Sequence, residues 1–241
     1  MDGNGRWAKR RGRPRVFGHR KGANRVREIV EAAGQMGIGY LTLYAFSEEN
    51  WARPRDEVTV LFSLLSRYLR SEIKALYDNN VCLKGIGNRD SLPADCRRLL
   101  EDGEARTADR TGLKLILALS YGGRSEIIDA VRRIAGQVDK GLLRPEAICQ
   151  EHFSSEMETA GVPDPDLLIR TSGEQRISNF LLWQMAYTEL YFTNVFWPDF
   201  DRSQFEKALE AYACRDRRYG KLSSPGFLSQ VEEIPDVRSI K

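Results

Sequence analysis

The chain has 241 residues, of which 41% are hydrophobic and 29% are charged, so it can bury a core and form one large domain. Its 37 lysines and arginines barely outnumber its 34 acidic residues, so the overall charge neither requires nor excludes a nucleic-acid partner. The four cysteines are scattered without a C-x-x-C pair, which argues against a zinc centre or a disulfide framework and favours a reducing, cytoplasmic location. No apolar run reaches the length of a membrane span, and no signal peptide is recognisable.

Hydrophobic periodicity along the chain predicts alternating helices and strands. A helix is predicted to start after Gly18 and to end at the glycines of 34–37, followed by a strand over 40–46. The polar loop 47–54 leads into a long helix. The remaining predicted helices cover 56–77, a segment after Pro93, 125–138, 145–153 and 203–219, and the remaining strands cover 81–86, 113–119, 167–169 and part of the buried segment 180–192.

This alternation predicts a single α/β domain with a mostly parallel central sheet flanked by helices. Ligands of such sheets bind beyond the carboxyl ends of the strands, so the loops 47–54 and 170–178 are expected to meet there. We expect the catalytic domain to span residues 1–222. Residues 223–241 are predicted to be a loosely ordered tail, because Pro225, Gly226 and Pro235 interrupt any helix.

The first residues of the chain carry the most informative motif, Asp2-Gly3-Asn4-Gly5-Arg6-Trp7. Its two glycines allow the backbone to approach a ligand closely. Asp2 offers an oxygen ligand for Mg²⁺, and Arg6 offers forked donors to phosphate oxygens. The motif therefore favours a cradle for a diphosphate and a metal ion, although the same residues also suit a tight turn.

Four further segments carry related chemistry in a fixed order, namely Gly18-His19, 47–54, 170–180 and 189–192. Together with the opening motif they resemble the cis-prenyltransferases, and specifically bacterial undecaprenyl diphosphate synthase (isoprenyl transferase), over nearly the whole chain. The resemblance implies repeated Mg²⁺-dependent condensation of isopentenyl diphosphate onto an allylic diphosphate, usually farnesyl diphosphate. The implied product is a long-chain ditrans,polycis-undecaprenyl diphosphate, the carrier lipid of cell-wall synthesis. No D-D-x-x-D motif occurs, which separates the chain from the trans-prenyltransferases.

The resemblance also implies roles for individual residues. Asp2 would hold Mg²⁺ against the allylic diphosphate, and Glu189 would be the second Mg²⁺ ligand. Asn50 matches the position proposed as proton acceptor, but because a neutral amide is a poor base, we expect it to position substrate, with the diphosphate itself as a rival base. The other matched positions are Gly3, Asn4, Gly5, Arg6, Arg15 and His19 at the allylic diphosphate, Arg170, Arg176 and Ser178 at isopentenyl diphosphate, and Trp7, Ser47, Glu48, Glu49, Trp51, Arg53 and Ile177 as further substrate contacts.

Plainer roles remain open for several of these residues. Trp7 and Trp51 could anchor the core or a lid, and His19 could cap a helix. The carboxylates of Glu48, Glu49 and Glu174 could be solvated or support other site residues. The basic run 10–13 is typical of a solvated face that speeds anion capture.

The sequence leaves two other functions open. One is a nucleic-acid-binding module that uses the basic block 9–15, although we expect no nucleic-acid partner. The other is a non-catalytic subunit of a heteromeric prenyltransferase. Such subunits typically lose motif residues, whereas this chain retains Asp2, Arg6, Asn50, Arg170, Arg176 and Glu189.

The growing product requires a hydrophobic tunnel, predicted to lie between the sheet and two helices. The helices 26–36 and 58–76 are expected to face the strands 41–46 and 113–119, with Ala45 and Leu113 at positions that line the tunnel in the family. Burial of one five-carbon unit gains about 3–4 kcal/mol at ~0.8 kcal/mol per CH₂. Release of a long product is therefore slow, and peripheral contact with the inner face of a membrane is expected. Product length and the preferred allylic primer are not specified by the sequence.

Two further expectations come from the resemblance. A homodimer is implied, with the 176–178 region near the subunit contact. In the family a strand precedes the opening motif, so we expect the first strand to be missing before Met1. Without that strand, Asp2 is expected to be loosely held beside a charged α-amine.

Overall fold

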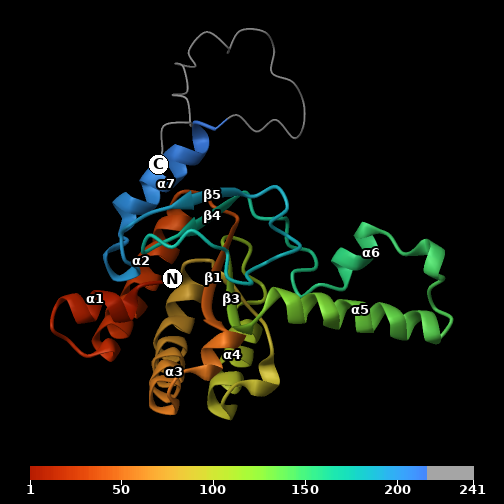
Figure 1. The fold of residues 1–241 in the computed structure, drawn as a ribbon, viewed down its shortest axis with the longest axis horizontal. Coiled ribbons are helices and arrows are strands. Elements are labelled where there is room, and N and C mark those ends of the chain that lie inside the picture. Colours follow the sequence, from red (N-terminus) through yellow and green to blue (C-terminus); the bar gives the residue numbers. More distant parts are fainter. Residues whose placement is uncertain (216–241) are drawn as a thin grey trace, which may run out of the picture.

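The computed structural model describes residues 1–215, whose strands form two parallel sheets (Figure 1). The first sheet has the order β1-β3-β2 and contains β1 (Tyr40–Ser47), β2 (Cys82–Ile86) and β3 (Lys114–Tyr121). The second sheet pairs β4 (Leu167–Arg170) with β5 (Glu189–Phe192). The predicted α/β class and parallel pairing are confirmed. The described strands are divided between two sheets, however, with β1 and β4 each at a sheet edge.

Strand β3 is the centre of the fold because its side chains are apolar on both faces. On one face, Leu115, Leu117 and Leu119 belong to the main core with α2 (Arg15–Gln35), α3 (Arg55–Asp78) and α4 (Ala94–Thr107). On the other face, Ile116 and Ala118 pack with Phe180 and Leu181. The segment after β4 therefore closes the second face of the first sheet.

The opening motif forms a helix start rather than an isolated turn. Gly3 has a left-handed φ of 95°, and α1 (Asn4–Arg10) begins at the next residue. A β-carbon added at Gly18 of α2 would lie 1.9 Å from the carbonyl oxygen of Asn4, so glycine alone allows this close packing of α1 on α2. Helix α2 begins directly after Pro14, earlier than the predicted start after Gly18.

The last helices differ from the predicted ranges. Helices α5 (Gly123–Asp139) and α6 (Gln150–Ser155) form an arm that extends away from the sheets (Figure 1). A short 3-10 turn at Pro145–Ala147 replaces the start of the helix predicted over 145–153. Helix α7 (Arg202–Ala213) ends earlier than predicted, and both residues 216–219 of that prediction and the predicted tail 223–241 lie outside the described residues. In the part of the chain that is described, no helix is long and apolar enough to span a membrane.

Candidate active site

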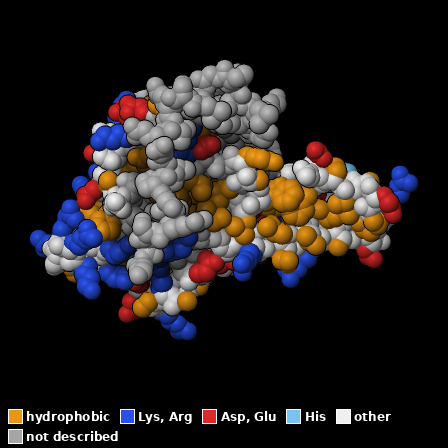
Figure 2. Space-filling model, turned by 45° about the horizontal axis from the view of Figure 1, so that its top comes forward, with side chains coloured by type: hydrophobic (Ala, Val, Ile, Leu, Met, Phe, Trp, Pro, Cys, Tyr) orange, Lys and Arg blue, Asp and Glu red, His pale blue; other side chains and the backbone are white. Residues whose placement is uncertain are grey.

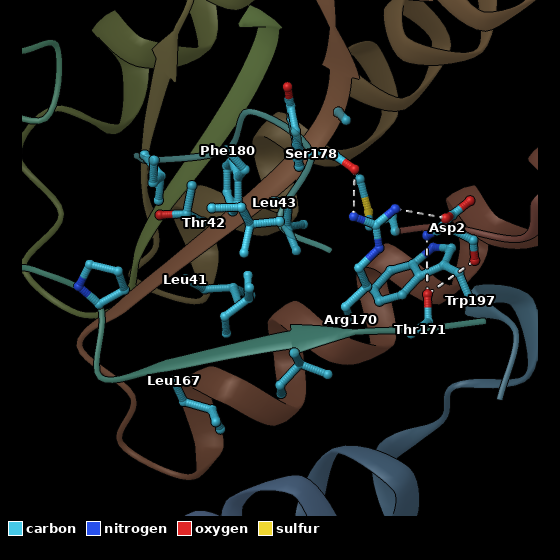
Figure 3. A pocket seen from close by; sticks show the side chains of 18 of the residues that line it. Asp2, Leu41, Thr42, Leu43, Leu167, Arg170, Thr171, Ser178, Phe180 and Trp197 are labelled. Atoms are coloured by element: carbon cyan, nitrogen blue, oxygen red, sulfur yellow. Dashed lines mark hydrogen bonds and ion pairs between the residues drawn. The ribbon is translucent and has the colours of Figure 1, made fainter. Parts of the chain in front are cut away.

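A cavity of about 1020 Å³ lies between the edge strands β1 and β4 (Figure 3). Its polar end, called the mouth below, is lined by Asp2, Arg6, Arg15, His19, Asn50, Arg53, Arg170, Arg176 and Ser178. Its apolar part, called the interior, is lined by Ile29, Leu41, Leu43, Ala45, Leu61 and Leu168. The carboxyl ends of β1 and β4 both reach the mouth, as predicted for a parallel α/β sheet.

Asp2 is fixed at the mouth through its backbone. Its N–H donates to the Thr171 Oγ1 at 3.1 Å, and its carbonyl oxygen accepts from the Ser172 hydroxyl at 2.7 Å and from the Trp197 N–H at 3.1 Å. The expectation of a loosely held Asp2 is therefore wrong, because the segment after β4 ties it down.

The Asp2 side chain lies among hydrogen-bond donors and positive charges. Its Oδ1 accepts from the Gly3 N–H at 2.7 Å, while Oδ2 lies 3.2 Å from Arg170 Nη2 and 3.5 Å from Arg6 Nη2. Partial burial alone would raise the pKa of Asp2, but the Gly3 N–H and the Arg170 guanidinium outweigh it and hold that pKa below its ordinary value. Asp2 is therefore an ionised oxygen donor at neutral pH.

Arg170, Arg176 and Ser178 come together as predicted. Arg170 Nη1 donates to the Ser178 hydroxyl oxygen at 2.7 Å and also to the carbonyl oxygen of Arg176, so one guanidinium links this loop to Asp2 (Figure 3). Ser178 has a left-handed φ of 52°. Glu174 pairs with Arg6 at 2.6 Å and with Arg176, so it joins the opening motif to the same loop.

A second ion cluster at the mouth is centred on Glu57, a residue that sequence reasoning missed. Its Oε1 lies 3.3 Å from Arg15 Nη2, 3.2 Å from Arg53 Nη1 and 3.7 Å from His19 Nε2. Burial lowers the pKa of His19 below its ordinary value even though the Glu57 carboxylate opposes the shift. The available signal was an acidic residue in the first turn of a helix, four positions after Arg53.

The segment after β1 forms the 3-10 helix η1 (Glu48–Ala52), which brings Ser47, Glu49 and Asn50 to the cavity. The Asn50 Oδ1 accepts from the Ser47 N–H at 3.2 Å, so its amide group helps to cap η1. Glu48 accepts from the Ser125 hydroxyl at 2.6 Å and Glu49 from the Asn179 amide at 2.8 Å. These two carboxylates thus connect η1 to neighbouring segments.

Three predicted substrate contacts do not line the cavity. Trp7 is buried with Ala8 and Phe196, which supports the core-anchor alternative. Trp51 stacks on Phe62 with ring centroids 5.2 Å apart and donates to the Ser120 hydroxyl at 2.8 Å. Glu48 is the third. By contrast, Gly3, Asn4, Gly5 and Ile177 all line the cavity.

Glu189 does not join Asp2 within one chain. It begins β5, where it lies opposite Leu167 of β4, whereas Arg170 lies opposite Phe192 at the other end of the strand pair. The Glu189 carboxylate is 2.6 Å from Arg215 Nη1. One chain therefore does not bring the two predicted Mg²⁺ ligands together, because the strand register separates them.

The remaining donor set at the mouth fits a metal ion shared with a ligand. In residues 1–215, no group of three or more acidic, histidine or cysteine side chains could hold an ion without further ligands. Mg²⁺ is commonly bound by one or two carboxylates together with phosphate oxygens and water. Asp2 beside Arg6 and Arg170 suits that arrangement.

Comparison with known proteins identifies the family. The family model described as "Putative undecaprenyl diphosphate synthase" matches residues 1–220. This chain belongs to that family. Family membership confirms the resemblance seen in the sequence and makes the protein a prenyltransferase of isoprenoid biosynthesis.

Relatives in sequence and structure agree with this membership. The isoprenyl transferase of Agrobacterium fabrum is 55% identical over 92% of this chain and 90% of its own length, and that of Geobacter sulfurreducens is 51% identical over 93% and 91%. Lavandulyl diphosphate synthase from Lavandula x intermedia, solved in complex with dimethylallyl diphosphate, superposes with a TM-score of 0.90 at 38% identity, covering 92% of this chain and 95% of its own. A probable undecaprenyl diphosphate synthase from Campylobacter jejuni gives 0.74 at 33% identity, covering 83% and 92%.

Proposed function

We propose that this protein is an Mg²⁺-dependent cis-prenyltransferase that adds isopentenyl diphosphate repeatedly to an allylic diphosphate such as farnesyl diphosphate. The observation that carries the proposal is the division of one cavity into a cationic mouth and an apolar interior. A prenyl diphosphate has the same two parts. The structural relative bound to dimethylallyl diphosphate, an allylic diphosphate, supports this substrate class.

The allylic diphosphate is assigned to the part of the mouth formed by Asp2, Arg6, Arg15, His19 and Arg53. Asp2 would hold Mg²⁺, which when bound supplies positive charge against the leaving diphosphate. Arg6 and Arg15 bind phosphate oxygens, and their fixed positions stabilise negative charge where it develops. Glu57 keeps Arg15 and Arg53 oriented toward this part of the mouth.

Isopentenyl diphosphate is assigned to Arg170, Arg176 and Ser178. Their guanidinium groups can bind phosphate through paired hydrogen bonds, which fixes the orientation of the five-carbon unit. The terminal alkene carbon of that unit bonds to C1 of the allylic substrate as the C1–O bond to diphosphate breaks. The proton then lost from C2 passes to the departing diphosphate, and Asn50 positions the reactants.

The growing prenyl chain is assigned to the interior, along Ile29, Leu41, Leu43, Ala45 and Leu61. These residues belong to α2, β1 and α3, which are three of the four elements predicted to wall the tunnel. Strand β3 contributes none, and Leu113 is buried in the main core. The extended product is a long-chain polyprenyl diphosphate for cell-wall carrier lipid.

The same proposal includes a homodimer and peripheral contact with a membrane. The arm of α5 and α6 exposes the apolar side chains of Ile128, Val131, Leu142 and Ile148, which suits burial against a second copy. Sedimentation velocity tests this part of the proposal. A dimer that dissociates on Ile128→Asp/Val131→Asp substitution is expected, and a monomeric wild type contradicts it.

The main test is incubation of the purified protein with farnesyl diphosphate, labelled isopentenyl diphosphate and Mg²⁺. The expected result is a ladder of butanol-extractable products that disappears when a chelator removes the metal. Mass spectrometry of the longest product reports its length. A folded sample that yields no labelled lipid rejects the proposed function.

A further inference from the structure

The positive charge of this chain is concentrated near its start. Residues 3–27 contain ten lysines and arginines and no acidic residue, whereas the rest of the chain has 27 lysines and arginines against 34 acidic residues. The cavity uses only some of these cations, since Arg6 and Arg15 line its mouth. Arg25 and Arg27 pair with acidic side chains of α2 and α3. The remaining cations need a separate explanation.

These remaining cations lie where α1 ends and α2 begins. We call residues 9–21 the basic hairpin. All of residues 9–15 are exposed, as are Arg20 and Lys21. Arg11 pairs with Asp199 and Arg15 with Glu57, but no ion pair formed by the described residues includes Lys9, Arg10, Arg13, Arg20 or Lys21. These five positive charges are available to an external anionic partner.

An exposed aromatic side chain lies among them. Phe17 keeps 45% of its surface exposed, and its spacing from Arg20 and Lys21 places all three on one face of α2. Apolar and basic side chains that share an exposed helix face are typical of surfaces that dock on anionic bilayers, where the cations meet headgroups and the apolar group inserts.

The basic hairpin is rigid and borders the cavity mouth. Close packing at Gly18 and Gly22 holds Asn4 of α1 against α2. Arg6, Arg15 and His19, which line the mouth, come from the same two helices. Lysine and arginine side chains gather at this end of the molecule in Figure 2. A surface bound by the hairpin would therefore lie close to the mouth.

We infer that the basic hairpin docks the protein on a bilayer rich in anionic lipid headgroups, next to the mouth. This surface deepens the proposed function, since it places the exit of a polyprenyl product near the membrane that receives it. Single-stranded nucleic acid is favoured less, because such sites stack bases on several aromatic side chains. In the basic hairpin, Phe17 is the one aromatic residue, and the neighbouring Trp7 is buried.

The test is co-sedimentation of the full chain with vesicles of phosphatidylglycerol and phosphatidylcholine, compared with phosphatidylcholine alone. Binding is expected only to the anionic vesicles, and it should weaken as salt is added. The variant Lys9→Gln/Arg20→Gln/Lys21→Gln should lower the partition coefficient on the order of 100-fold, because each cation near an anionic surface contributes several-fold. The matched control Arg98→Gln/Lys140→Gln/Arg144→Gln removes the same charge from other exposed positions and should bind like the wild type.

A second variant separates insertion from charge. Phe17→Ser should weaken the part of vesicle binding that persists at high salt, because it removes the apolar side chain and keeps the net charge unchanged. Wild-type binding by the triple hairpin variant, or an equal loss in the control, would overturn the inference. So would a hairpin variant that loses binding to single-stranded RNA while its vesicle binding is unchanged.

Condensation measured in detergent keeps this inference distinct from the proposed function. The triple hairpin variant should retain the wild-type rate there, since Lys9, Arg20 and Lys21 do not line the cavity. A wild type that binds anionic vesicles but makes no product would reject the transferase proposal and leave the docking surface standing. An active wild type that does not bind anionic vesicles would overturn the docking surface and support the transferase proposal.

Discussion

The mouth and the interior of the cavity are held together by different forces. At the mouth, Asp2, Glu57 and Glu174 pair with arginines from several segments, so each position is set by directional contacts. In the interior, leucine and alanine side chains offer apolar area without direction. A substitution at the mouth should therefore act mainly through the loss of a charge, whereas a substitution in the interior should act mainly through the volume of the side chain.

This difference separates two properties of the proposed enzyme. An arriving diphosphate must replace carboxylates such as Glu174 on Arg6 and Arg176, so the mouth selects the anion and sets the rate. The interior gains free energy in proportion to the apolar length that it accepts, so it sets the size of the product. Changes at the mouth should alter the rate, and changes in the interior should alter product length.

The largest effect is expected from Asp2→Asn. The amide keeps an acceptor for the Gly3 N–H but removes the negative charge between Arg6 and Arg170. We expect condensation to fall about 10²–10³-fold, the range measured when one preorganised electrostatic group is lost. Steady-state incorporation of labelled isopentenyl diphosphate measures it, with the exposed Asp199→Asn as a matched control. An Asp2→Asn protein that is folded and as fast as Asp199→Asn would show that the metal assignment is wrong.

A smaller effect is expected at the loop that carries Arg176 and Ser178. Asn179, at φ 60°, accepts from the Arg124 N–H at 2.9 Å and donates to Glu49 at 2.8 Å, so it ties this loop to η1. Asn179→Asp would set two carboxylates face to face and should raise the KM for isopentenyl diphosphate about tenfold, as for a lost hydrogen bond to a charged group.

The double variant Asn179→Asp/Glu49→Gln sharpens that prediction. The new glutamine can donate to the new aspartate, so the hydrogen bond is restored with its polarity reversed. We expect the KM to return to within about threefold of the wild type. If the double variant is no better than Asn179→Asp, the contact with Glu49 does not position the loop.

Glu57→Gln should have a milder effect, an increase of about three- to fivefold in the KM for the allylic diphosphate, since partly exposed ion pairs contribute modestly. Steady-state kinetics with the allylic substrate varied measures this change.

The contact between Glu57 and His19 also affects how the stability of the fold depends on pH. Because the folded-state pKa of His19 is lowered, the unfolded chain binds its proton more readily, and stability should fall as the pH drops below the ordinary histidine value of about 6.5. Without the Glu57 carboxylate this loss should extend to lower pH, and a His19→Gln variant should lack it. Urea unfolding between pH 5 and pH 8 measures both.

The smallest effect on rate is expected from Ala45→Phe. The larger side chain fills space in the interior but leaves the mouth intact, so the first condensation should stay within about twofold of the wild type while the longest product becomes shorter. Chromatography of the extracted lipids against polyprenol standards measures chain length. If the longest product keeps its wild-type length, the growing prenyl chain does not run along β1.

The gathering of Asp2, Arg6, Arg170, Arg176 and Ser178 was predictable because few residue types bind phosphate and their motifs follow predicted strands. Tryptophans were harder to place, since Trp7 and Trp51 suit a hydrophobic core as well as a ligand. Glu189 stays a prediction as an Mg²⁺ ligand, but its separation from Asp2 within one chain was not foreseen, because sequence order does not specify which end of a strand pair a residue occupies. The short helix α1 was missed because glycine disfavours helices, and packing against Gly18 and Gly22 overrides that preference.

The apolar interior was less predictable than the mouth. Leucines that line a cavity and leucines that fill a core have the same periodicity, so Leu41 and Leu113 could not be told apart from their spacing. Their difference arises from how the two sheets separate along β1 and β4, which depends on long-range packing. The Glu57 cluster was also hard to predict, because two of its partners come from α2 and the third from the loop before α3.

The ties from Asp2 to Thr171, Ser172 and Trp197 have a consequence for biosynthesis. Ribosomes add about 5–20 residues per second, so roughly 10–40 s pass between synthesis of Asp2 and synthesis of the residues that hold it. During that interval the nascent chain already displays its cationic beginning without the partners that complete the catalytic centre. Activity can therefore appear only after the segment that contains Trp197 has left the ribosome, and a chain that stops short of Trp197 should be inert.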